Sequence, residues 1–182
     1  MNSKNEKKII ALNLFARSNM CEEIMVEHPI KPVYDKNSRV LILGSFPSVK
    51  SREANFFYGH PQNRFWKVLA AVFEAEVPIT VEEKRAFLLK HGVAVWDVIK
   101  SCDIVGSSDS SIKNVVPNDL REILNTAEIA HIFVNGKTAE QYYKKYIEKE
   151  IGRKATCLPS TSPANAAWSV EKLVVEWKQI LL

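Results

Sequence analysis

Cysteine is scarce in this sequence, and its three cysteines lie far apart. Cys21, Cys102 and Cys157 form no CxxC pair and show no metal-ligand spacing. Zinc sites and iron–sulfur clusters use closely spaced cysteines or histidines, so the pattern supports neither kind of centre. Few and widely spaced cysteines are typical of reduced thiols, and we therefore expect an intracellular protein.

Long apolar runs are also missing. A membrane-spanning helix needs about 20 consecutive apolar residues, and the longest runs here fall far short of that length. The N-terminus has no apolar stretch followed by a small-residue cleavage site, so the sequence predicts no signal peptide. It also has no glycine-rich phosphate loop and no GxSxG turn, which argues against nucleotide-binding and serine-hydrolase chemistry.

The chain does have the composition of an ordinary globular domain. Its 182 residues are 46% hydrophobic, which suits one domain with a buried core. The formal net charge of +4 and the sequence pI of 8.9 make it mildly basic. This balance permits an anionic partner, but many soluble enzymes share it, so the charge alone does not identify the partner.

Short apolar strands alternate with amphipathic helices over most of the chain. The expected strands are residues 39–43, 93–96, 129–134 and 155–158. The expected helices are residues 64–73, 82–90 (with Thr80 as its N-cap), 118–125, 137–149 and 171–182. Such alternation predicts an α/β fold with a mostly parallel sheet of about four strands, covered by helices. We expect a polar loop at residues 101–114, and a tail or loosely docked helix at residues 1–27 before a domain at residues 28–182.

Each expected strand ends in a polar loop. The loops are GSFPS at residues 44–48, WDV at residues 96–98, VNGK at residues 134–137 and LPSTSPAN at residues 158–165. In a parallel sheet these loops share one edge, which is where open α/β sheets bind their ligands. We therefore expect the functional site at this edge. The sequence leaves open whether Asp97, in the second loop, activates water or holds a loop.

Two long motifs carry a family resemblance. The first joins GSFPS at residues 44–48 to FYGHPQNRFW at residues 57–66, and the second is LPSTSPANA at residues 158–166. In this order they resemble the uracil-DNA glycosylase superfamily, most closely its hypoxanthine-DNA (deoxyinosine) glycosylase branch. The mismatch-specific uracil/thymine-DNA glycosylase branch is similar over the HPxNRFWK segment and at Gly136 and Lys137.

The resemblance implies a three-layer α/β/α domain that removes a damaged base from DNA by hydrolysing the N-glycosidic bond. It implies hypoxanthine as the base, double-stranded DNA containing a deaminated base as the partner, no cofactor and no metal. No lysine is well placed for Schiff-base chemistry, so we expect a monofunctional enzyme that leaves an abasic site. We expect a monomer without membrane association, cytoplasmic and at the nucleoid when it acts on DNA.

One position departs from the wider superfamily. Most branches have Asn or Asp at the third position of the first motif, where it handles the attacking water, whereas this chain has Phe46. A phenyl ring cannot orient water. The hypoxanthine branch resembles this chain in lacking that residue, and there the Asn of the HPxN segment, here Asn63, takes over. We therefore expect Asn63 to be catalytic, orienting water or binding the purine through its amide; its alternative is a helix N-cap.

The other expected site residues fall into two groups. Stacking of a base on an aromatic ring is worth about 1–3 kcal/mol, which suits an enzyme that must extrude its base from the duplex. The expected base-binding residues are Gly44, Ser45, Phe46, Phe57, Tyr58 and His60. Short hydroxyls, amides and a lysine suit phosphate contacts. The expected DNA-binding residues are Ser48, Lys137, Ser160, Ser162 and Asn165.

These assignments have simpler alternatives. Phe46, Phe57 and Tyr58 also fit the core, His60 also fits a loop-holding role, and Lys137 also fits a solvated lysine. The segment 160–166 also fits a Ser/Thr turn that caps the last helix. For the whole protein, two alternatives stay open: a uracil or mismatch-specific uracil/thymine-DNA glycosylase, and a DNA-binding module without catalysis, which the change from Asn to Phe46 allows.

Overall fold

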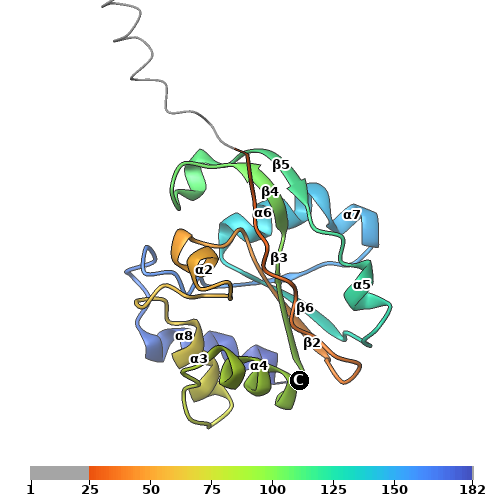
Figure 1. Ribbon diagram of the computed structural model, residues 1–182. Helices are drawn as coiled ribbons and strands as arrows, with labels where there is room; N and C mark the ends of the chain where they lie inside the picture. Colours follow the sequence, from red (N-terminus) through yellow and green to blue (C-terminus); the bar gives the residue numbers. More distant parts are fainter. Residues whose placement is uncertain (1–24, 182) are drawn as a thin grey trace, which may run out of the picture.

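A parallel four-stranded sheet lies between two layers of helices in the computed structural model, which describes residues 25–181 (Figure 1). The strand order is β3–β2–β6–β7, with β3 at Val93–Asp97, β2 at Val40–Gly44, β6 at His131–Asn135 and β7 at Thr156–Leu158. The expected three-layer α/β/α fold is confirmed. Residues 1–24, most of the expected tail, lie outside the described residues.

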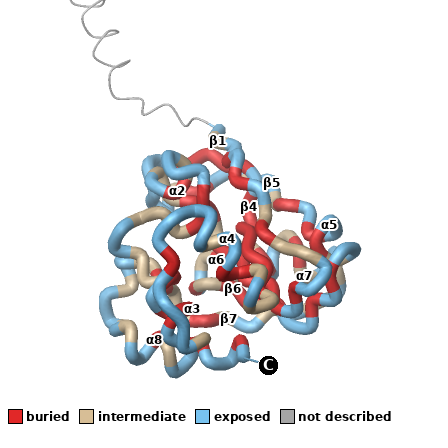
Figure 2. The backbone as a smooth tube through the Cα atoms, turned by 60° about the horizontal axis from the view of Figure 1, so that its bottom comes forward, coloured by how far each residue is buried: buried red, intermediate tan, exposed pale blue. Residues whose placement is uncertain are grey.

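β2 is the inner strand on which the sheet is built. All five of its residues are buried, and Leu41, Ile42 and Leu43 have no exposed surface. A parallel strand covered on both faces needs such a continuous apolar run. β2 pairs in parallel with β3 on one side and with β6 on the other. Figure 2 shows the buried residues concentrated in the interior, with the exposed ones around them.

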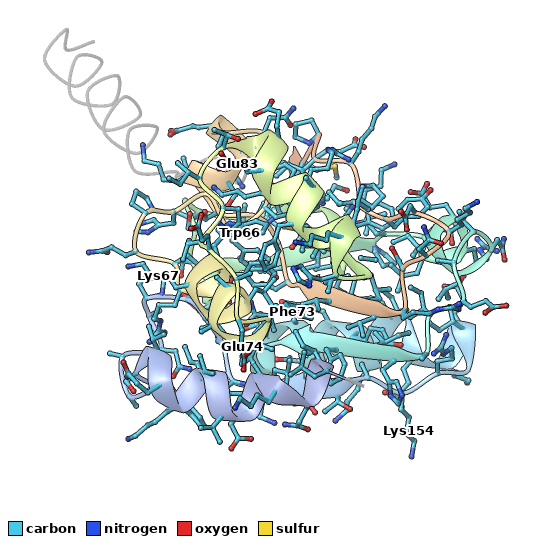
Figure 3. All side chains as sticks on the ribbon, turned by 90° about the horizontal axis from the view of Figure 1, so that it is seen from below. Trp66, Lys67, Phe73, Glu74, Glu83 and Lys154 are labelled. Carbon is cyan, nitrogen blue, oxygen red and sulfur yellow. The ribbon has the colours of Figure 1, made fainter. Side chains whose placement is uncertain are left out.

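Three helices cover one face of the sheet: α3 (Phe65–Val72), α4 (Val81–Lys90) and α8 (Val170–Trp177), which continues into η2 (Lys178–Ile180). The ring of Phe65 meets that of Trp177 edge to face, with centroids 5.7 Å apart. Figure 3 shows Trp66 turned inwards and Lys67 pointing outwards, as the amphipathic pattern requires. The expected N-cap of α4 is confirmed, because Thr80 Oγ1 accepts from Glu83 N at 3.1 Å.

The opposite face carries α5 (Arg121–Leu124), α6 (Lys137–Tyr146) and α7 (Glu148–Ile151), which differ in length from expectation. The helix expected at residues 118–125 is only one turn long. The buried side chain of Asn118 donates to Asp97 O at 2.9 Å and so belongs to the sheet edge instead of the helix. The helix expected at residues 137–149 is divided at Ile147, whose buried side chain holds the joint against the core.

A second, antiparallel sheet was not expected. It has the order β1–β4–β5, with β1 at Met25–Glu27, β4 at Ile99–Asp103 and β5 at Lys113–Pro117, and η1 (Asp109–Ser111) lies between the last two. The prediction of a loop throughout residues 101–114 is therefore wrong. β4 reads IKSCD, and tertiary pairing on both sides overrides its weak strand pattern. The last three residues of the expected tail form β1.

Within residues 25–181, no helix is both long enough and apolar enough to cross a membrane.

We predict that Trp177→Ala destabilises the protein by about 3–5 kcal/mol, because a large aromatic side chain leaves a cavity in the core. Trp177 has no exposed surface, and its Nε1 donates to Pro159 O at 3.0 Å. Urea unfolding measures the loss. The matched control is Val175→Ala on the same helix, where the residue is 68% exposed and the expected change is within about 0.5 kcal/mol. Equal effects of the two changes would contradict this packing.

Candidate active site

A cavity of about 340 Å³ opens at the carboxyl ends of β2, β3 and β6, between the loops that follow them and the loop after β7. A loop between β4 and β5 forms a further part of its wall. The structure brings together every expected site residue except Asn165 in the lining, which contains Gly44, Ser45, Phe46, Ser48, Phe57, Tyr58, His60, Asn63, Lys137, Ser160 and Ser162. Asn165 lies just outside, beyond Ala164.

Asn63 has its carbonyl oxygen engaged and its amide nitrogen free. Its Oδ1 accepts from Phe65 N at 3.0 Å and from Thr161 Oγ1 at 3.0 Å. Among the described residues, its Nδ2 has no hydrogen-bond partner. The helix-cap alternative thus accounts for Oδ1, which accepts from a backbone N–H at the start of α3, but not for Nδ2. The two N–H donors remain for a ligand in the cavity.

Thr161 joins Asn63 to the end of β6. Its hydroxyl accepts from Asn135 Nδ2 at 2.9 Å while donating to Asn63, and its backbone N donates to Asn135 Oδ1 at 3.0 Å. Thr161 is fully buried, so each of these polar groups is satisfied inside the protein. The network fixes which end of the Asn63 amide faces the cavity.

Arg64 fixes the loop that follows β7. Its backbone N and its Nε donate to Thr161 O, at 3.1 and 3.2 Å. Its Nη atoms donate to the backbone oxygens of Ser162, Asn165 and Trp168. One guanidinium can satisfy several carbonyls because its five N–H groups form a rigid fork. The sequence reasoning missed this residue, because nothing in an arginine that follows Asn63 shows which carbonyls it reaches.

Tyr58 is fixed between the core and the cavity. Its backbone has φ +52°, an uncommon left-handed conformation for a tyrosine, and its ring stacks on Phe65 with centroids 3.7 Å apart. Burial, aided by the nearby Asp97, raises the pKa of its hydroxyl well above the ordinary value. That hydroxyl is buried, and the side chain of Asn135 is close enough to lower its pKa slightly against the effect of burial. Because the Tyr58 ring stacks on Phe65, one of its two faces is covered by that side chain.

Phe46 and Phe57 line the cavity from buried positions. Phe57 is 2% exposed and meets Phe56 edge to face, and Phe46 is 8% exposed with its ring against that of His28. Both side chains therefore also belong to the core, as their alternative holds. Their contribution to the cavity is an apolar wall.

Asp97, at the end of β3, is buried in the cavity wall. It is 4% exposed, and within the described part of the chain its Oδ2 has no hydrogen-bond partner. Burial raises the pKa of this carboxyl to about 7. Gly44 makes room for it: a Cβ at Gly44 would overlap Asp97 Oδ1 and lie 3.3 Å from the hydroxyl of Tyr58. The sequence offered Asp97 only as an undecided residue.

The rim of the cavity is held by short local hydrogen bonds. Ser160 Oγ accepts from Ser162 N at 3.2 Å, Ser162 Oγ accepts from Ala164 N at 3.3 Å, and Asn165 Nδ2 donates to Ser160 O at 2.9 Å. These bonds match the Ser/Thr-turn alternative. The seryl O–H donors stay available at the rim.

The remaining expected residues also make local contacts. Ser48 is the N-cap of α2 (Val49–Glu53), and His60 Nδ1 accepts from Gln62 N at 3.2 Å. Lys137 Nζ is exposed and pairs with Glu140 Oε2 at 2.8 Å. An exposed pair of this kind contributes little to stability. Among residues 25–181, no cluster of His, Cys, Asp or Glu has the arrangement of a metal site.

Comparisons with known proteins agree with this geometry. The family model described as the uracil DNA glycosylase superfamily matches residues 31–181. A hypoxanthine DNA glycosylase of Methanosarcina acetivorans is 32% identical over 160 residues, covering 86% of this chain and 98% of the relative. A hypoxanthine DNA glycosylase of Methanosarcina barkeri is 30% identical over 143 residues, covering 78% of this chain and 89% of the relative.

A solved structure has the same fold. It is a solution NMR structure from Methanosarcina acetivorans, provisionally described as a uracil DNA glycosylase, with a TM-score of 0.72 and 27% identity. The match covers 87% of this chain and 100% of that one. The chain thus belongs to the uracil DNA glycosylase superfamily. With its cavity at the carboxyl ends of the strands, it is a DNA glycosylase.

We predict that Arg64→Lys loosens residues 160–168, because a lysine ammonium cannot replace a fork that reaches several carbonyls at once. Amide hydrogen exchange of the peptides from this segment should become faster, while exchange in β2 stays unchanged. Lys67→Arg, on the exposed side of α3, is the control and should alter neither. Unchanged exchange of residues 160–168 in Arg64→Lys would show that the loop does not depend on the guanidinium.

Proposed function

We propose that this DNA glycosylase removes hypoxanthine from double-stranded DNA that contains deaminated adenine, and that it leaves an abasic site without cutting the strand. The observation that carries the proposal is the free amide nitrogen of Asn63 in a cavity walled by Tyr58, Phe46 and Phe57. The names of the two Methanosarcina relatives support hypoxanthine as the base.

In this proposal the cavity holds a base that has been extruded from the duplex. A base inside the duplex cannot be reached, and unstacking and unpairing it costs a few kcal/mol. The aromatic wall offsets that cost, because stacking on a ring is worth about 1–3 kcal/mol per base. The ring of Tyr58 is already held parallel to Phe65, so its position costs no entropy on binding. Tyr58 is therefore the proposed stacking partner, and Phe57 and Phe46 shape the pocket around the base.

Asn63 is the proposed catalytic residue. Its oxygen is held by Phe65 and Thr161, so its amide N–H groups are fixed before the substrate arrives. Fixed donors of this kind orient a water molecule for attack on C1′ of the sugar without reorganisation during the reaction. In this proposal they orient the water that the phenyl ring of Phe46 cannot orient. As the glycosidic bond breaks, positive charge develops on the sugar, and the adjacent DNA phosphates stabilise it.

The rim is the proposed DNA interface. Ser48, Ser160 and Ser162 present hydroxyls, and Lys137 presents an ammonium group at the start of α6. Contacts of this type bind phosphates and set the register of the duplex without reading its sequence. Asn165 stands behind them and braces the Ser160 backbone. His60 completes the rim beside the base.

The position of the lysine in the cavity lining supports the proposal that the strand is not cut. Schiff-base chemistry needs an amine directed at the sugar carbon. Lys137 is the lysine of the cavity lining, and its Nζ is directed instead to Glu140 at the surface. We also propose that the protein acts as a monomer on DNA inside the cell.

The substrate is tested with labelled duplexes that contain hypoxanthine, uracil, xanthine or a T·G mismatch, each treated with hot alkali after incubation. We predict breakage at hypoxanthine and no breakage before the alkali step. Breakage confined to uracil would replace the proposal with a uracil-specific enzyme. Binding of every duplex without any alkali-labile product would show a DNA-binding module. Breakage without alkali would contradict the monofunctional assignment.

We predict that Asn63→Asp lowers the single-turnover rate of hypoxanthine excision by about 10²–10³-fold, the usual loss when one fixed donor is removed. The variant keeps the oxygen that accepts from Phe65 N and Thr161 Oγ1, so the midpoint of urea unfolding should stay close to that of the parent protein. Gln179→Glu makes the same chemical change outside the cavity lining and should retain full activity. Retention of normal turnover in Asn63→Asp would leave Asn63 as a helix cap.

A further inference from the structure

The carboxyl group of Asp97 serves no visible structural purpose. Asn118 donates to the backbone oxygen of Asp97 and not to its side chain, and among the described residues Oδ2 has no partner at all. Burial is the cause of the raised pKa of Asp97, and no cation opposes it among the described residues. A buried carboxyl group without a hydrogen-bond donor or a cation beside it costs stability. Its presence in the cavity wall therefore suggests a role in function.

The position of Asp97 is next to the proposed base site. Asp97 Oδ1 and the hydroxyl oxygen of Tyr58 both lie beside Gly44, at 2.2 and 3.3 Å from where a Cβ on that residue would be. Tyr58 and Asp97 line the same cavity, so a base bound against Tyr58 lies within reach of Asp97. Among the described residues, the other carboxyl of the lining belongs to Asp109, which lies in η1 between β4 and β5.

A departing purine needs a proton, and a neutral carboxyl group can donate one. The electron pair of the broken bond enters the purine ring, and a proton delivered to the ring makes the purine a better leaving group. Hypoxanthine shares with guanine the acceptors N7 and O6 on one edge, whereas adenine has an amino donor in place of O6. Protonation at N7 gives a stable neutral tautomer of the base. An uncharged buried carboxylic acid can serve as such a donor.

Resting on the proposed function, we propose that Asp97 is a second catalytic residue, the general acid that protonates N7 of hypoxanthine as the base leaves. The proton moves from the Asp97 carboxyl to N7, and the C1′–N9 bond breaks with its electron pair going to the purine. The water held by Asn63 adds to C1′ and releases its proton to solvent, from which Asp97 is protonated again. The sum is hydrolysis to the free base and an abasic sugar.

The surroundings of Asp97 suit this role. Its pKa is raised to about 7 by burial, so the acid form dominates below pH 7 and is lost above it. Tyr58 stays neutral because its pKa is raised further. His28, which packs against Phe46, stays neutral near pH 7 because burial lowers its pKa to about 4. At the rim, the remaining titratable groups are His60, Lys137 and Asp109, and burial raises the pKa of Asp109 as well.

The test compares the parent protein with Asp97→Asn and Asp109→Asn in single-turnover excision of hypoxanthine from about pH 5 to pH 9. The parent rate should be highest below pH 7 and fall about tenfold per pH unit well above it. Asp97→Asn should be about 10²-fold slower or more and lose this dependence. Asp109→Asn should keep it. An unchanged pH profile in Asp97→Asn overturns the inference.

A second substrate separates proton donation from a structural effect of the substitution. In 7-deaza-2′-deoxyinosine, a carbon replaces N7 and O6 is kept. Asp97→Asn should then cost less than about threefold, because the two changes remove the same interaction. An equal loss on both substrates overturns the inference. If the parent protein releases no hypoxanthine at all, the proposed function itself is wrong. Thermal unfolding controls for folding: Asp97→Asn should melt no lower than the parent at pH 8, since it removes an unpaired buried charge.

Discussion

The hydrogen bonds of Thr161 hold the active site together. Its hydroxyl and backbone N bind both ends of the Asn135 amide, and the same hydroxyl donates to Asn63. Its carbonyl accepts from the backbone and side chain of Arg64. The end of β6, the start of α3 and the loop after β7 are distant in sequence, and this one buried threonine sets their spacing. The direction of the Asn63 amide, and with it the proposed water site, depends on that spacing.

The cavity that results combines satisfied and unsatisfied polar groups. Every polar group of Thr161 itself is paired, which makes that wall rigid. At the floor, the hydroxyl of Tyr58 is buried, and one oxygen of Asp97 has no hydrogen-bond partner within residues 25–181. Burying them costs stability, and the fold makes space for them by having no side chain at Gly44. Such a contrast suits an enzyme. The rigid wall positions the reacting groups, and the unpaired oxygen of Asp97 is available to a bound base.

The sequence predicted the parts of this structure that depend on local pattern. The apolar run of β2 and the alternation of strands with helices indicated the parallel sheet, and parallel strands bring their ends together by geometry alone. β4 and β5 were missed because their polar sequences form strands only through pairing with each other and with β1. The role of Asp97 was left open because the sequence does not show whether the carboxyl group of an aspartate has a partner in the folded chain. The reach of Arg64 is likewise a property of the folded chain.

A crystal structure with DNA tests the central claim most directly. The duplex should contain 2′-fluoro-2′-deoxyinosine, whose glycosidic bond resists hydrolysis, so the bound state before reaction can be seen. The account predicts a hypoxanthine turned out of the helix and lying in the cavity against Tyr58, with a water molecule on the Asn63 amide nitrogen and the N7 edge toward Asp97. A base that remains stacked in the duplex, or one bound with Asn63 and Asp97 both out of contact, would contradict it.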